Sequence, residues 1–238
     1  MKKQEQIFLP GINKQLEFLY EKTDKKFESI LVIGAASENI ATLLSKKYGI
    51  TVELIVNDYE SLLNSKLLIE NHPSINLKLM DYENTDYKNS SFELIYAQAS
   101  ISTNNRKKIL KEIKRILKEN GFFCLGEVVK LKEPVPPFVQ NVFNASNLSP
   151  LFIDELINYY LQNNFVVIDK LDLTYTLKDY YTSTSNALKR YIKNATDEEK
   201  REYKKILNRI GHETSVYLKL GGEKFIGFVS LLLQKEPQ

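Results

Sequence analysis

The chain has 238 residues, a formal net charge of +3 and 43% hydrophobic residues, which is typical of one large globular domain or of one domain with an appendage. No apolar run reaches the roughly 18 residues of a membrane-spanning helix, and we expect no signal peptide because no apolar segment follows the first lysines. The single cysteine, Cys124, excludes an internal disulfide, and with two histidines it offers too few ligands for a zinc or iron site. We therefore expect a cytoplasmic protein without a metal site, and the charge is too mild to indicate nucleic acid binding.

Residues 28–39, with the sequence ESILVIGAASEN, organise the chain. The apolar run from Ile30 to Ile33 ends at Gly34, which is typical of a strand buried on both faces. Apolar residues then recur at helical spacing over residues 40–48. This strand–turn–helix is the first half of a βαβ unit, and nucleotide-like ligands bind at such turns in open α/β sheets.

Strands and helices alternate on both sides of this unit. Residues 1–27 are expected to form a lead-in with a short helix, and residues 28–129 a core of strands and helices. Further strands are predicted at 51–56, 75–80, 92–97 and 122–129, and in the second of these Ile75, Leu77 and Leu79 are expected to face inward. Helices are predicted at 59–70 and 106–119, and Asn120-Gly121 is expected to end the second helix. This alternation predicts a doubly wound, mostly parallel α/β sheet.

The pattern changes after Lys130. Residues 133–137, rich in proline, are predicted as a stiff connector, and Ser149-Pro150 as the start of a helix. A strand is predicted at 165–175, a helical insert at 177–211 with a capping box from Thr196 to Glu199 and a stop at Gly211, and a final strand at 225–233 that could run antiparallel. Residues 130–238 would thus complete the sheet and place a helical lid over its cleft.

Two stretches resemble the class I S-adenosylmethionine (SAM)-dependent methyltransferases of the small-molecule type. Residues 81–95, DYENTDYKNSSFELI, are similar to the family stretch Asp-Ala-Glu-Asp-Leu-Pro-Phe-Pro-Asp-Asn-Ser-Phe-Asp-Leu-Val. Residues 109–121, ILKEIKRILKENG, are similar to the family helix and turn REIxRVLKPGG. The resemblance implies a seven-stranded Rossmann-like sheet with helices on both faces, SAM as cofactor, and methyl transfer to a small molecule.

The glycine-rich turn of that family is altered in this chain. The family pattern acidic–x–Gly–x–Gly–x–Gly falls on Val32, Gly34, Ala36 and Glu38, so Gly34 alone is retained. Glycines there allow the backbone to approach the methionine part of the cofactor closely. A methyl group at Ala36 is small, and we expect the turn to tolerate it only at a negative φ. Glu38 could supply the charge that Val32 lacks, and a turn that no longer holds SAM is the alternative.

Further cofactor-binding residues follow from the resemblance at the strand ends. Asn57 or Asp58 would bind the ribose hydroxyls, Asp81 would accept a hydrogen bond from the adenine amino group, and the backbone amide of Tyr82 would reach a ring nitrogen. Ala97 and Gln98 would form the floor of the methyl-transfer site. The structural alternatives are polar strand caps at Asn57 and Asp58, and a turn-initiating aspartate at Asp81.

Four residues are weaker candidates for the acceptor side of the cleft. These are Glu127 at the end of a strand and Tyr180, Tyr181 and His212 in the helical insert. Simple packing is the alternative for the tyrosines, and helix capping for His212. No general acid or base stands out, which favours catalysis by proximity and orientation.

Residues 106–118 carry seven lysines and arginines on a predicted helix. Glu112 and Glu119 alternate with them, and the basic residues lie opposite the apolar stripe, which favours a solvated face over nucleic acid binding. The sequence thus predicts a methyltransferase with a small-molecule acceptor. The alternative is a catalytically inactive protein that acts as a binding or scaffolding subunit. With either function, the chain could form a homodimer or bind a protein partner. The acceptor atom stays open, although a single cysteine disfavours a metalloid.

Overall fold

A computed structural model describes residues 7–69 and 72–236. Residues 1–6 of the predicted lead-in and Glu70, the last residue of the helix predicted at 59–70, lie outside the described residues. The elements are, in chain order, α1 Lys14–Lys22, β1 Ile30–Ile33, α2 Glu38–Tyr48, β2 Val52–Val56, α3 Tyr59–Ile69, β3 Ile75–Leu79, β4 Phe92–Gln98, α4 Arg106–Ile116, β5 Leu117–Lys130, α5 Pro137–Ala145, β6 Leu151–Phe152, α6 Leu156–Gln162, β7 Phe165–Asp172, α7 Leu177–Asn194, α8 Asp197–Glu202, α9 Lys204–Lys219 and β8 Ile226–Lys235.

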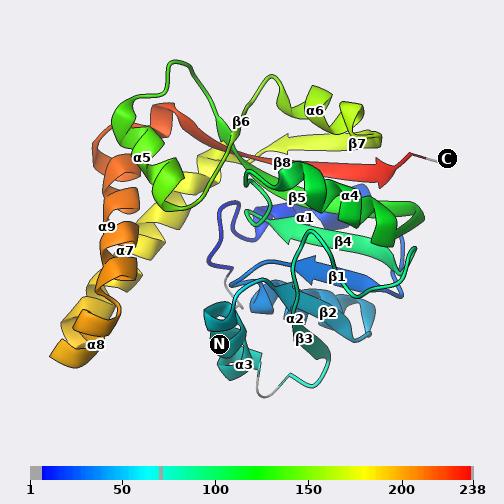
Figure 1. Ribbon diagram of the computed structural model, residues 1–238, viewed down its shortest axis with the longest axis horizontal. Helices are drawn as coiled ribbons and strands as arrows, with labels where there is room; N and C mark the ends of the chain where they lie inside the picture. The colour runs from blue at the N-terminus through cyan, green and yellow to red at the C-terminus, as the bar shows by residue number, and fades with distance from the viewer. Residues whose placement is uncertain (1–6, 70–71, 237–238) are drawn as a thin grey trace.

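The strands form one mixed sheet in the order β3-β2-β1-β4-β5-β8-β7, with the short β6 pairing with β5. The pairs from β3 to β5 are parallel, and β8 runs antiparallel to both of its neighbours. The predicted seven-stranded, mostly parallel sheet is thereby confirmed, as is the antiparallel last strand. The parallel strands bring their carboxyl ends to one edge, where the altered turn after β1 lies (Figure 1).

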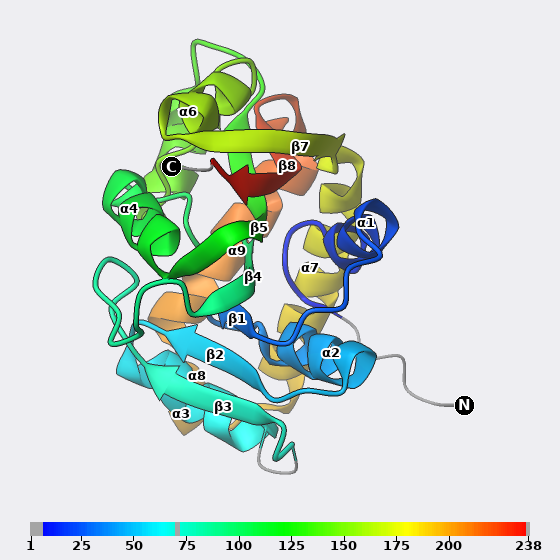
Figure 2. The ribbon, with the colours of Figure 1, turned by 90° about the vertical axis from the view of Figure 1, so that its right-hand side faces the viewer.

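Helices cover both faces of the sheet, as Figure 2 shows. Helices α4 and α6 pack on one face through residues such as Leu110 and Tyr160. Helices α1 and α2 pack on the other face through residues such as Leu19 and Leu44. The strands between them are buried on both sides, which explains why β1 is a continuous apolar run.

Helices α7, α8 and α9 form an arm that stands across the carboxyl ends of the parallel strands (Figure 1). Its base joins α5 and β8 in a third apolar cluster that includes Phe143, Tyr181 and Phe228. In the described part of the chain, no helix is both long and apolar enough to cross a membrane.

The helix predicted at 106–119 ends early, at Ile116, and β5 begins at Leu117. The backbone amides of Ser90 and Ser91 donate to the carbonyls of Arg115 (2.9 Å) and Ile116 (2.7 Å), so the loop before β4 satisfies the end of the helix. Asn120 does adopt the left-handed conformation, with a φ of +57°, but inside β5 rather than as a helix cap.

One prediction for the connecting region is wrong. Ser149-Pro150 leads into β6 instead of a helix, because the Ser149 amide donates to the carbonyl of Ser102 (2.7 Å) and holds this segment beside β5. The proline-rich connector instead leads into α5, with Pro137 at the first helical position, where the missing N–H costs nothing.

The capping box at Thr196 is confirmed and begins α8, but Gly211 does not stop a helix. It lies inside α9, which continues to Lys219, so the helices of the arm span residues 177–219. In β3, Leu79 is 47% exposed rather than inward-facing, since this strand is at the edge of the sheet.

Candidate functional site

A polar cavity of about 240 Å³ lies at the carboxyl ends of the parallel strands. It contains three of the residues predicted for the cofactor, Asn57, Asp81 and Tyr82. Its other lining residues are Glu83, Ser100, Thr103, Asn104, Asn105, Ile109 and Asn147. The cavity is smaller than the roughly 300–1,000 Å³ of typical ligand pockets, so it matches part of a nucleoside-sized ligand rather than all of it.

Asp81 is the exposed carboxylate of this cavity. One oxygen accepts from the backbone amide of Glu83 (2.9 Å), and the other has no donor among the described residues. The next residue, Tyr82, is buried, and this burial raises the pKa of its phenol well above the usual range. The site therefore offers one unused acceptor beside a buried, protonated phenol.

The structure separates the two ribose candidates, Asn57 and Asp58. Asp58 caps α3, because its carboxylate accepts from the backbone amide (2.8 Å) and the hydroxyl (2.6 Å) of Ser61. It lines a different cavity, of about 690 Å³, between α3 and the Lys205 and Arg209 side of α9. Asn57, in contrast, lines the polar cavity together with Asp81.

The turn after β1 keeps the backbone shape of a glycine-rich turn. Gly34 has a φ of +133°, and a Cβ atom there would lie 2.7 Å from Cβ of Ser100, so only glycine fits. Ala36 has a φ of +59°, which contradicts the expected negative value. Alanine thus adopts the left-handed conformation that glycine adopts without strain.

The other altered positions of the turn point away from it. Val32 is fully buried in the core. Glu38 is buried and accepts a hydrogen bond from the hydroxyl of Ser65 in α3, so its charge does not face the turn. Ser37, at the start of α2, is different: its hydroxyl is buried and has no hydrogen-bond partner among the described residues. An unpartnered buried hydroxyl next to Gly34 is suited to a polar ligand group at this turn.

Ala97 and Gln98 are buried at the end of β4. The Gln98 amide nitrogen donates to the carbonyls of Pro10 (2.7 Å) and Ile12 (3.0 Å), and its oxygen accepts from the hydroxyl of Tyr96 (2.8 Å). Gln98 therefore fastens the N-terminal segment to the sheet. Neither Ala97 nor Gln98 lines the polar cavity.

Glu127 belongs to a closed internal network. Its carboxylate is fully buried, pairs with Arg106 through Nε (2.9 Å) and Nη2 (3.2 Å), and accepts from the hydroxyls of Ser102 and Tyr160. Arg106 also donates to the carbonyl of Ser149 (2.8 Å), which ties the loop before β6 to α4. With its acceptors used internally, Glu127 has no free side toward a substrate.

The candidates in the arm lie apart from the polar cavity. Tyr181 is buried, stacks on Tyr217 with ring centroids 4.3 Å apart, and donates to Glu213 (3.0 Å). Tyr180 packs edge-on against Tyr181, and His212 is exposed inside α9, where it cannot cap a helix. Glu213 was missed by the sequence reasoning, and its burial raises the pKa of its carboxyl.

Three asparagines were also missed as site residues. Asn104 and Asn105 precede α4, and the pair is visible in the sequence as a polar turn after a predicted strand. Asn147 has a φ of +52° and lines the cavity from the loop after α5, and no pattern in the sequence indicates this position. Within residues 7–69 and 72–236 there is no group of three or more His, Cys, Asp or Glu side chains that could hold a metal ion.

Comparisons with known proteins agree with this geometry. Residues 31–125 match the family model of a methyltransferase domain, whereas no curated protein matches the sequence significantly. The structure is similar to Haemonchus contortus phosphoethanolamine N-methyltransferase 2 in complex with S-adenosyl-L-methionine (TM-score 0.78, 12% identity, 94% of this chain and 53% of that one).

Two other solved structures share the fold. One is the geranyl diphosphate C-methyltransferase of Streptomyces coelicolor A3(2), with a TM-score of 0.68, 12% identity, and coverage of 94% of this chain and 77% of that one. The other is the [4+2]-cyclase SpnF, with a TM-score of 0.74, 14% identity, and coverage of 95% and 81%. Identities this low establish the fold alone.

The site residues fit SAM. Gly34 forms a cradle that a Cβ atom would fill, the Ser37 hydroxyl is unpartnered, and Asn57 and Asp81 face one cavity. Residues 31–125 thus match a methyltransferase domain, and the chain shares the fold of the SAM-dependent methyltransferases compared above.

Proposed function

We propose that this methyltransferase transfers the methyl group of SAM to a small-molecule acceptor, with the cofactor bound across the carboxyl ends of β1, β2 and β3. The observation that carries the proposal is the polar cavity that joins Asn57 and Asp81 beside the turn at Gly34. Relatives of the same fold have small-molecule acceptors in their names, phosphoethanolamine and geranyl diphosphate, which supports an acceptor of that size class.

Each part of the cofactor has a residue suited to it. The open oxygen of Asp81 would accept from the adenine amino group, and the Asn57 amide would bind the ribose hydroxyls with one acceptor and two donor hydrogens. The amide of Tyr82 would contact the adenine ring. The turn from Gly34 to Ser37, with the hydroxyl of Ser37, would hold the polar end of the methionine part.

Positioning is the main contribution of this chain to catalysis. When bound, SAM supplies an electrophilic methyl group on a sulfonium, whose positive charge is lost on transfer. The described lining residues include no histidine, lysine or cysteine, and of the two carboxylates Asp81 is assigned to the adenine and Glu83 pairs with Lys108. The residues therefore serve to align the acceptor and exclude water, the latter through Asn147 and the arm above the strand ends. An acceptor that is already nucleophilic suits this site.

The altered turn favours one alternative, a binding or scaffolding protein that does not catalyse. The strained φ of Ala36 and the inward Glu38 are departures from the family pattern at the cofactor itself. The fold is compatible with other activities, since a [4+2]-cyclase shares it.

Calorimetric titration with S-adenosylhomocysteine distinguishes the two. Asp81→Ala should weaken binding at least about tenfold, because a buried ligand amino group loses its acceptor. Asp58→Ala is the matched control, since Asp58 caps α3 and should leave the affinity nearly unchanged. No binding by the unaltered protein would contradict the proposal. Equal affinities for the unaltered protein and Asp81→Ala would remove Asp81 from the site.

A further inference from the structure

Helix α4 borders a groove that the proposed reaction does not use. Two cavities, of about 600 and 550 Å³, lie along the helix and share Lys111 and Lys114. The second cavity begins at Asn104 and Asn105, which also line the polar cavity of the cofactor. We call the two cavities together the α4 groove. It runs from the rim of the cofactor cavity along α4 to Asn164, at the turn between α6 and β7.

The lysines of the α4 groove carry more positive charge than nearby acidic side chains neutralise. Lys107, Lys111 and Lys114 lie four and three residues apart, on one side of the helix, and none forms an ion pair within the described residues. Adjacent cations are paired, Lys108 with Glu83 (3.2 Å) and Arg115 with Glu112 (2.6 Å). Unpaired ammonium groups this close repel one another, and a bound anion would relieve the repulsion.

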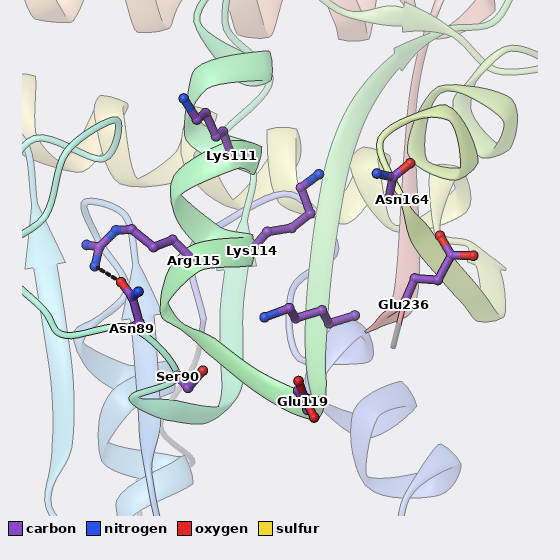
Figure 3. A pocket seen from close by; sticks show the side chains of 9 residues that line it. Asn89, Ser90, Lys111, Lys114, Arg115, Glu119, Asn164 and Glu236 are labelled. Carbon is purple, nitrogen blue, oxygen red and sulfur yellow. Dashed lines mark hydrogen bonds between the residues drawn. The ribbon is translucent and has the colours of Figure 1, made fainter. Parts of the chain in front are cut away.

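Among the described lining residues, the acidic side chains Glu119 and Glu236 line only the first cavity. Figure 3 shows Lys111 and Lys114 projecting from α4, with Asn164 and Glu236 across the cavity and Glu119 at its far end. Arg115 turns away toward Asn89, to which it donates a hydrogen bond (2.9 Å). The second cavity is lined by lysines and asparagines without an acidic side chain. An anionic ligand would therefore lie over residues 107–114 and stop before Glu119.

The residues that line the α4 groove indicate which kind of anion it would bind. The groove has no aromatic lining residue on which a nucleic acid base could stack. It has asparagines instead, Asn104, Asn105, Asn163 and Asn164, whose amides both donate and accept, as a peptide backbone does. Alternate side chains of an extended peptide are ~6.7 Å apart, close to the ~6 Å rise from Lys107 to Lys111.

We infer that the α4 groove binds an acidic segment of a partner protein, in an extended conformation, with its carboxylates on Lys107, Lys111 and Lys114. This inference does not depend on the identity of the methyl acceptor, because neither Lys111 nor Lys114 lines the cofactor cavity. The nearness of Asn104 and Asn105 to both sites places the bound segment at the edge of the cofactor cavity.

Fluorescence anisotropy with the full chain tests the inference. The probe is a fluorescein-labelled peptide of alternating Glu and Ser, about ten residues long, compared with the same peptide carrying Gln for Glu and with a thymidine oligonucleotide of equal length. The Glu peptide should bind most tightly, and its affinity should fall as salt rises. Binding of the oligonucleotide in preference to the Glu peptide, equal binding of the Gln peptide, or no binding of the Glu peptide would overturn the inference.

Charge reversal locates the site. Lys111→Glu with Lys114→Glu should weaken binding of the Glu peptide by about tenfold or more. The matched control is Lys189→Glu with Lys193→Glu, two exposed lysines on α7, which should retain the affinity. If the charge-reversed protein does not fold, Lys111→Ala with Lys114→Ala takes its place and should still weaken binding. If a folded variant at Lys111 and Lys114 bound the Glu peptide with unchanged affinity, the α4 groove would not be the binding site.

Discussion

Glu127 and Asp81 are two carboxylates at the same edge of one sheet, yet their surroundings are opposite. Glu127 is fully buried, and Arg106, Ser102 and Tyr160 occupy its oxygens. Asp81 is exposed, uses one oxygen for the amide of Glu83, and faces a polar cavity with the other. Glu127 was predicted as a site residue because it ends a strand, and Asp81 because of the family resemblance. Unused hydrogen-bonding capacity, rather than position on the edge, therefore distinguishes a residue suited to a ligand from a structural one.

The largest effect is expected at the structural carboxylate. Glu127→Ala should lower the free energy of unfolding by about 3–5 kcal/mol, because it leaves Arg106 as a buried and unpaired charge. Urea unfolding followed by circular dichroism measures the loss. Glu127→Gln, which keeps one acceptor oxygen for either Ser102 or Tyr160, should lose less. A loss under about 1 kcal/mol in Glu127→Ala would show that the network is not structural.

The two aspartates after β2 and β3 should separate stability from binding. Asp58→Ala should cost about 1 kcal/mol of unfolding free energy, since it removes the N-cap of α3. Asp81→Ala should stay within about 0.5 kcal/mol of the unaltered protein, because it removes a single exposed hydrogen bond, from the amide of Glu83. Parallel urea titrations check both values. A larger loss for Asp81→Ala than for Asp58→Ala would reverse the roles assigned here.

The strained turn should respond to glycine. Ala36→Gly should raise the free energy of unfolding by up to about 1 kcal/mol, because glycine adopts the φ of +59° without the steric cost that alanine has. Glycine loses more backbone freedom than alanine on folding, and this loss offsets part of the gain in stability. Thermal unfolding provides the measurement, with Ala35→Gly as the matched control on the adjacent exposed residue. Destabilisation by Ala36→Gly would argue against strain at this position.

The smallest effect is a pH dependence in the arm. Burial raises the pKa of Glu213, so its carboxyl favours the folded state when protonated, and this stability is lost as the pH rises through the raised pKa. Glu213→Gln stays neutral and keeps an acceptor for Tyr181. The two proteins should have similar unfolding free energies near pH 4, and the variant should gain relative to the unaltered protein toward pH 8. A constant difference over this range would contradict the role of Glu213.

The sequence predicted the doubly wound, mostly parallel sheet because buried strands and amphipathic helices have distinct periods, as at Ile30–Ile33 and in α4. It failed where tertiary contacts decide the local structure. The end of α4 depends on the amides of Ser90 and Ser91, and Ser149 is held by Ser102. It also missed Asn147 and Glu213, because their roles come from loops and helices that meet only in the folded chain. Asn57, Asp81 and Tyr82 were predicted through the family resemblance.

The most direct test of the account is thermal unfolding of the unaltered protein with and without millimolar SAM or S-adenosylhomocysteine. A ligand at about 100 times its dissociation constant adds roughly 2.7 kcal/mol to the stability of the folded state. We predict a clear upward shift of the melting temperature with both compounds, because the turn at Gly34 and the cavity at Asp81 retain a cofactor-binding geometry. The absence of a shift with either compound would contradict SAM binding and favour the binding or scaffolding alternative.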